Sequence, residues 1–127
     1  MDDERLAAVR ARIAAITDPD PTPAESALVL RLLRSFVAKT PAAVEQLLDG
    51  FERKDPGLVR DQAHALKGSA ANIGATTLAA LCAAVEDQAR AGAVTDPAGT
   101  ADQIRAEATE ALAAVAALAE AYDLSPS

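Results

Sequence analysis

The only histidine of the chain, His64, stands beside a lysine and a glycine in the segment HALKGSAANIGA, residues 64–75. An imidazole with an ordinary pKa of about 6.5 keeps a free nitrogen lone pair at pH 7, and is a good nucleophile toward phosphorus. The phosphohistidine formed in this way would carry negative charge, which Lys67, one helical turn away, is placed to balance. Gly68 leaves room for a partner that carries the phosphoryl group, although glycine costs a helix about 1 kcal/mol relative to alanine.

This chemistry needs a histidine that faces solvent, and helical geometry predicts one. One face of a helix over 56–73 collects five apolar side chains, Val59, Ala63, Leu66, Ala70 and Ile73. At 100° per residue, His64 lies about 140° from that face and Gly68 about 180°. We therefore expect a buried apolar face and an exposed His64, which argues against a core histidine.

Other chemistries fit the same residues poorly. One histidine and the distant Cys82 are too few ligands for a metal site. Ser69 lies about 80° to the other side of the apolar face and points away from His64. The chain also lacks a nucleophile elbow, so a triad hydrolase is not supported.

The apolar periodicity predicts the helices before this segment. A first helix, whose apolar residues span 6–16, ends at TDPDPTP, residues 17–23, because three prolines in seven residues cannot continue a helix. Its apolar face consists of Leu6, Val9, Ile13 and Ile16. A long helical pattern follows over residues 27–53. Pro41 stands inside it, and predicts either a kink near Lys39–Thr40 or a break into two helices.

The helix that carries His64 has clear ends. Asp55 is the expected N-cap and Pro56 the first helical residue, while Gly74 suits the position just after the helix. Thr76 or Thr77 is expected to cap the next helix, which ends at Gly92 and has its core face at Leu78, Leu81, Cys82, Val85 and Ala89.

The remaining chain is predicted as a loop, VTDPAGT, a final helix and a tail. The apolar face of that helix consists of Ile104, Ala108, Ala111, Leu112, Val115, Leu118 and Tyr122. We expect one domain over 1–127, with a core bundle at about 25–122, an accessory N-terminal helix at 1–16 and a frayed tail at 123–127.

Composition indicates an all-α helical bundle. Half of the 127 residues are hydrophobic, but there is no tryptophan, one tyrosine and only two phenylalanines, so alanine, leucine and valine must fill the core. The net charge of −7 argues against a nucleic-acid binder. No stretch approaches the roughly 20 apolar residues of a membrane span, and the acidic start is unlike a secretory signal. We expect a cytoplasmic location.

The segment around His64 resembles the motif of histidine-containing phosphotransfer (HPt) domains. That motif is approximately A-H-x-L-K-G-S-[SA]-x-x-x-G-A, followed by L-x-x-L-C-x-x-[LV]-E. This chain has the first part over 63–75, and the second part at Leu78, Leu81, Cys82, Val85 and Glu86. A weaker match extends back to Phe36, Pro41, Leu47 and Lys54–Asp55.

The resemblance implies an up-and-down antiparallel four-helix bundle with an extra N-terminal helix. It implies that His64 accepts a phosphoryl group from the aspartate of one receiver domain and passes it to another. The expected partners are receiver domains of a hybrid histidine kinase and of a response regulator. The chain would bind no cofactor, because the receiver supplies Mg²⁺, and would be a monomeric phosphocarrier without ATPase or kinase activity.

The resemblance also assigns roles around His64. Lys67 balances the phosphoryl charge and Gly68 allows access. Glu86 matches a polar position that hydrogen-bonds the imidazole, although it could equally be a solvated surface acid. The expected docking residues around His64 are Arg60, Asp61, Gly68, Ala71 and Arg90. Their face is either a basic patch that steers partners or an ordinary mixed surface.

Two related functions compete with this one. The dimerising helices of histidine kinases have an acid directly after the histidine and a proline five residues after it, where this chain has Ala65 and Ser69. A degenerate adaptor would bind receivers without being phosphorylated, but this chain retains His64, Lys67 and Gly68. The initial Met and the compact length favour a free-standing protein.

Overall fold

A computed structural model describes residues 3–124 of the chain. These residues form five α-helices, with no β-strand among them. The helices are α1 (Asp3–Ile16), α2 (Pro23–Arg53), α3 (Pro56–Ile73), α4 (Thr76–Arg90) and α5 (Pro97–Leu124). None of them combines the length and apolar character needed to cross a membrane.

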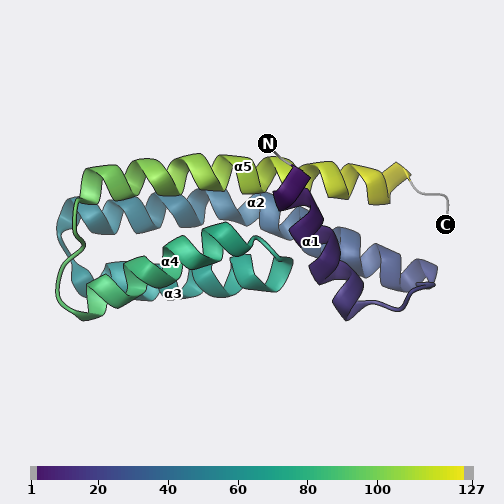
Figure 1. Ribbon diagram of the computed structural model, residues 1–127, viewed down its shortest axis with the longest axis horizontal. Coiled ribbons are helices and arrows are strands. Elements are labelled where there is room, and N and C mark those ends of the chain that lie inside the picture. The colour runs from purple at the N-terminus through teal and green to yellow at the C-terminus, as the bar shows by residue number, and fades with distance from the viewer. Residues whose placement is uncertain (1–2, 125–127) are drawn as a thin grey trace.

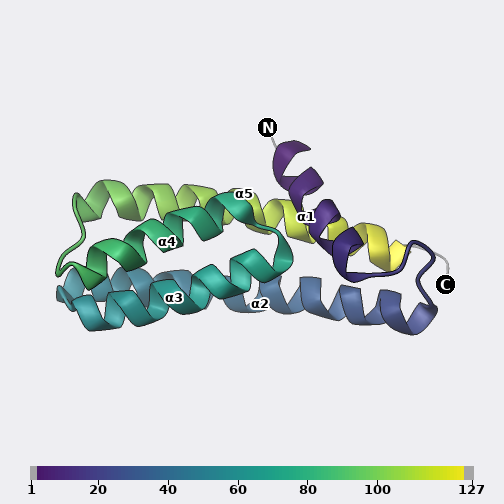
Figure 2. The ribbon, with the colours of Figure 1, turned by 60° about the horizontal axis from the view of Figure 1, so that its bottom comes forward.

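Four helices, α2 to α5, form an antiparallel bundle, as the family resemblance implied (Figures 1 and 2). The long α2 and α5 run side by side, and the α3–α4 hairpin packs along the C-terminal half of α2 and the N-terminal half of α5. The extra helix α1 lies away from the α2–α3 turn, where it packs on α5 and beside the α3–α4 turn. The fold is therefore the predicted one.

The predicted apolar faces meet in one core. The core includes Val29, Leu33, Phe36, Val44, Leu47, Val59, Leu66, Leu78, Cys82, Val85, Ile104 and Val115. From α1 it takes Val9 and Ile13, but Ile16, which was predicted on the same face, is 43% exposed at the end of the helix. Burial raises the pKa of the Cys82 thiol to about 12, so this cysteine is a neutral core side chain.

Of the two alternatives predicted at Pro41, a kink or a break into two helices, the break is wrong, because α2 continues through the proline as one helix. Pro41 itself is exposed, and the buried Thr40 and Val44 on either side keep to the core face. Proline inside a helix removes one backbone hydrogen bond and costs about 3 kcal/mol. Burial of the flanking side chains on the neighbouring helices offsets that cost.

The start and end of α3 are as predicted. The backbone N–H of Leu58 donates to Asp55 Oδ1 at 3.1 Å, and Pro56 is the first helical residue. Gly74 follows the helix in the left-handed conformation, with φ +88°. Both ends are fixed by local chemistry that a sequence displays directly.

Other boundaries differ from the prediction. Helix α2 begins at Pro23, within the predicted linker, and not at residue 27. Ala75, not a threonine, precedes α4 and makes no side-chain cap, because the chain turns sharply at Gly74 and re-enters a helix at once. Helix α5 begins at Pro97, within the predicted loop, because the Gly99 N–H donates to Asp96 Oδ1 at 3.3 Å. Of the predicted tail, residues 123 and 124 belong to α5 and 125–127 lie outside the described residues.

Candidate functional site

Helix α3 presents His64 to solvent, as predicted. The five apolar side chains of its other face are all buried: Val59, Ala63, Leu66, Ala70 and Ile73. The His64 side chain is 66% exposed. Ser69 is also exposed, five residues further along the helix and therefore in another direction. The histidine thus stands apart from the one hydroxyl side chain that this helix carries.

Glu86 on α4 lies directly behind the histidine and is almost fully buried, at 1% exposure. It forms a hydrogen bond to His64 through Oε2, 2.9 Å from Nδ1. The alternative of a solvated surface acid is therefore wrong. The sequence left this open because Glu86 lies at the edge of the apolar face of α4, and its burial depends on how closely α3 packs there.

Two cations share the same carboxylate. Lys67 Nζ donates to Glu86 Oε1 at 2.6 Å, and Arg90 Nη2 donates to Glu86 Oε2 at 2.7 Å. Glu86 thus accepts from two side chains of α3 and one of its own helix. We define these four residues, His64, Lys67, Glu86 and Arg90, as the Glu86 cluster.

The cluster keeps Glu86 charged. The hydrogen bond from Lys67 contributes most to lowering the pKa of this carboxyl below its usual value, burial opposes the shift, and His64 and Arg90 add to it. A charged carboxylate can only accept, so His64 Nδ1 must carry the proton in this hydrogen bond. The lone pair of the neutral ring then lies on Nε2, on the side away from Glu86.

The surface beside His64 is open. A Cβ added at Gly68 would meet nothing within 4 Å, and Gly68 and Ala71 are both exposed. The structure therefore offers no packing reason for a glycine at position 68. These two small residues leave the surface beside the imidazole unobstructed, which is what a protein partner would need.

The other predicted docking residues form a mixed surface. Arg60 Nη2 lies 3.2 Å from Asp61 Oδ1, and both side chains are about half or more exposed. The Arg90 side chain is exposed as well, but its guanidinium group is bonded to Glu86. Every cation predicted here thus has an acidic partner. The i, i+4 spacing of Glu86 and Arg90 could have revealed their pairing in the sequence.

A family model of the Hpt domain matches residues 31–120. The match covers most of the chain, and the chain belongs to the Hpt family, as the motif around His64 indicated. Members are phosphocarrier modules that interact with receiver domains, and membership implies histidine phosphotransfer in a phosphorelay. Searches among curated proteins and among solved structures gave no match to this chain.

Proposed function

We propose that His64 is the phosphoacceptor of this Hpt domain, and that it relays a phosphoryl group between the aspartates of two receiver domains. The observation that carries the proposal is the hydrogen bond between Nδ1 and the buried Glu86, on a histidine whose side chain is 66% exposed. It holds one ring nitrogen as N–H and leaves the other, Nε2, as the nucleophile that faces an open surface.

The chemistry follows from this arrangement. The Nε2 lone pair attacks phosphorus in line, and the bond from phosphorus to the receiver aspartate breaks with its electrons on the departing carboxylate. The ring gains positive charge as it is phosphorylated, and the adjacent Glu86 carboxylate stabilises that charge. Lys67 contacts the same carboxylate as His64, and is therefore the cation that we expect to balance the phosphoryl oxygens. Reversal of the same step delivers the group to a second receiver.

The partners and setting are part of the proposal. We propose that the donor is the receiver domain of a hybrid histidine kinase and the acceptor that of a response regulator, each with its own Mg²⁺. The chain would act as a monomer in the cytoplasm, and as a phosphocarrier without ATPase or kinase activity. The docking face would include Arg60, Asp61, Gly68 and Ala71 around the histidine.

The test is transfer from a phosphorylated receiver domain to the purified chain. We expect the parent to gain an acid-labile label and His64→Gln to gain none. Because His64 is exposed, its replacement should change the free energy of unfolding by less than about 0.5 kcal/mol. Ser69→Ala, an exposed change on the same helix, is the matched control and should be labelled like the parent.

Two outcomes would contradict the proposal. A parent that binds receivers but gains no label would be an adaptor. A label that survives in His64→Gln would place the phosphoacceptor elsewhere. Thermal unfolding of each variant shows whether a loss of label reflects chemistry or a loss of fold.

A further inference from the structure

Glu86 is bound by two cations, although the proposed phosphotransfer accounts for only one of them. Lys67 holds Oε1 from α3, while Arg90 holds Oε2 from α4, the helix of Glu86 itself. The following inference rests on the proposed function, because it concerns what this cluster does when His64 is phosphorylated.

Lys67 has two roles that compete. Before transfer its Nζ is 2.6 Å from Glu86 Oε1. After transfer the phosphoryl oxygens on His64 carry roughly two negative charges and attract the same ammonium group. An ammonium on a flexible stem can turn from one acceptor to the other. Each contact that Lys67 makes with the phosphoryl group therefore weakens its hold on a buried carboxylate.

A buried carboxylate that loses its cation is costly. Arg90 prevents that situation, because its contact does not depend on Lys67 or on α3. It reaches Glu86 from one turn further along α4 and binds Oε2 at 2.7 Å. Its side chain is 59% exposed, so Arg90 links the buried carboxylate to the solvent-exposed surface.

We propose that Arg90 is a positioning residue that holds Glu86 charged and in place, so that Lys67 can move from Glu86 to the phosphoryl group. In the transfer step, Nε2 forms the bond to phosphorus as the bond to the receiver aspartate breaks. The ring keeps its Nδ1–H and gains a positive charge. Glu86 then holds that N–H and Arg90, while Lys67 serves the phosphoryl oxygens.

The proposal predicts that Arg90 acts through Lys67. Without Arg90, Lys67 should remain on Glu86 and leave the phosphoryl group less well balanced. Arg90→Gln should therefore resemble a weak Lys67→Ala variant. In a background that already lacks Lys67, the loss of Arg90 should shorten the phosphohistidine lifetime little further. In that background no lysine has to move from Glu86 to the phosphoryl group.

The experiment labels His64 with phosphoramidate, which needs no docking surface, and follows the loss of phosphohistidine after the donor is removed. The variants are Arg90→Gln, Arg90→Lys, Lys67→Ala and the double variant Arg90→Gln/Lys67→Ala. Arg53→Gln is the matched control, since Arg53 also forms an exposed i, i+4 pair, with Asp49 at 2.7 Å. It changes the net charge equally, at a residue whose ion-pair partner is not a member of the cluster.

We expect Lys67→Ala to shorten the phosphohistidine lifetime and Arg90→Gln to shorten it by about two- to fivefold, the range of a modest ion pair. The double variant should match Lys67→Ala, since residues of one network are not additive. Arg90→Lys should recover most of the parental lifetime, and Arg53→Gln all of it.

Several results would overturn the inference. The lifetime of Arg90→Gln could equal that of Arg53→Gln, the two effects could multiply in the double variant, or Lys67→Ala could leave the lifetime unchanged. If Arg90→Gln impairs transfer from a receiver but not labelling by phosphoramidate, Arg90 is a docking residue instead. If the parent itself takes no label at His64, the proposed function fails, and this inference fails with it.

Discussion

Glu86 is a charged side chain at a place that water barely reaches, and its three donors explain how it stays charged there. Lys67, His64 and Arg90 together satisfy both carboxylate oxygens. Removing any one of them leaves two, so single changes around Glu86 should be tolerated by the fold. Removing the carboxylate itself affects all three partners at once. A substitution at position 86 is therefore the most direct test of what the charge contributes.

We predict that Glu86→Gln destabilises the protein at neutral pH, and that the difference from the parent shrinks in acid. The folded-state pKa of Glu86 is lowered, chiefly by Lys67, so its carboxylate contributes stability above the unfolded pKa of about 4.3. That contribution is lost as pH falls through the folded pKa. Thermal unfolding of both proteins, followed from about pH 7 down to about pH 3, measures the difference.

The comparison is best made in the His64→Gln background, where the imidazole that contacts Glu86 is absent. If Glu86→Gln destabilises that background as much in acid as at neutral pH, Glu86 acts by packing and not by charge. With His64 intact, Glu86→Gln should also slow labelling, because an amide can donate to Nδ1 as well as accept from it, and so no longer fixes Nδ1 as the N–H nitrogen.

At the level of residues, the sequence predicted which side chains face solvent better than it predicted which side chains contact one another across helices. The exposure of His64 follows from the rotation of one helix, which sequence spacing determines. The contacts of Lys67 and His64 with Glu86 depend on how α4 packs on α3, and spacing within one helix does not contain that information. The pairing of Glu86 with Arg90 is different, because both residues lie on α4 and their i, i+4 spacing could have revealed it from the sequence.

Among the helices, α3 has well-capped ends but a residue of low helix propensity near its middle. Asp55 and Gly74 fix its ends, whereas Gly68 in its middle is a poor helix former with open space around it. Nothing in the packing of the bundle requires this glycine. The helix therefore gives up stability beside His64, at the point where a receiver would have to approach.

We predict that Gly68→Ala stabilises the protein by up to about 1 kcal/mol, and that Gly68→Gln is at least as stable as the parent. The glutamine side chain would stand one turn from His64, and should severely slow transfer from a receiver. Alanine should have a milder effect. Labelling by phosphoramidate should be much less impaired in both variants, because that donor is small. Transfer rates from both donors, measured with thermal unfolding, test this.

Parental receiver-driven transfer in Gly68→Gln would refute the docking role of the glycine. Unfolding of the helix in that variant would also refute it, and would point to a backbone requirement that the open space around Gly68 does not suggest.

Helix boundaries were predictable where the deciding chemistry was local. Asp55 and Pro56 predict a helix start correctly, and the equivalent pair Asp96–Pro97 carries the same signal inside the segment predicted as a loop. The continuity of α2 through Pro41 was not available from local rules. It depends on the burial of side chains on both sides of the proline, which is a property of the assembled bundle.

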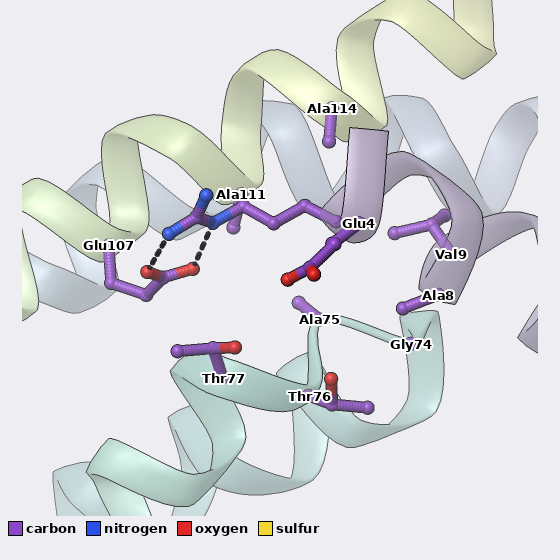
Figure 3. A pocket seen from close by; sticks show the side chains of 11 residues that line it. Glu4, Ala8, Val9, Gly74, Ala75, Thr76, Thr77, Glu107, Ala111 and Ala114 are labelled. Carbon is purple, nitrogen blue, oxygen red and sulfur yellow. Dashed lines mark hydrogen bonds and ion pairs between the residues drawn. The ribbon is translucent and has the colours of Figure 1, made fainter. Parts of the chain in front are cut away.

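On the scale of the whole molecule, α1 joins the end of the bundle that lies away from the α2–α3 turn. Arg5 binds both oxygens of the buried Glu107 on α5, each at 2.6 Å. The pair lines a pocket of about 310 Å³ between α1, the α3–α4 turn and α5 (Figure 3). Arg12 Nε donates to the carbonyl of Asn72 at 3.0 Å, so α1 also holds the end of α3.

Gly74 lies where α1 meets the α3–α4 turn, and we predict that Gly74→Ala is the most damaging of the glycine substitutions. An added Cβ would lie 2.7 Å from Arg12 Cβ and 2.9 Å from the Ala8 carbonyl oxygen, and φ at Gly74 is already +88°. Gly92 is the matched control, because its φ is +115° but a Cβ there would meet nothing within 4 Å.

Gly92→Ala should thus cost only the backbone strain, about 1–2 kcal/mol, while Gly74→Ala should cost more, because α1 must also move away from the turn. Chemical denaturation of both variants measures the difference. The Glu86 cluster is built entirely on α3 and α4, so phosphoramidate should still label His64 in folded Gly74→Ala. Equal losses of stability in the two variants would mean that α1 can move away from the turn without a loss of free energy of unfolding. A loss of labelling in folded Gly74→Ala would mean instead that the packing of α1 on the turn helps to position His64.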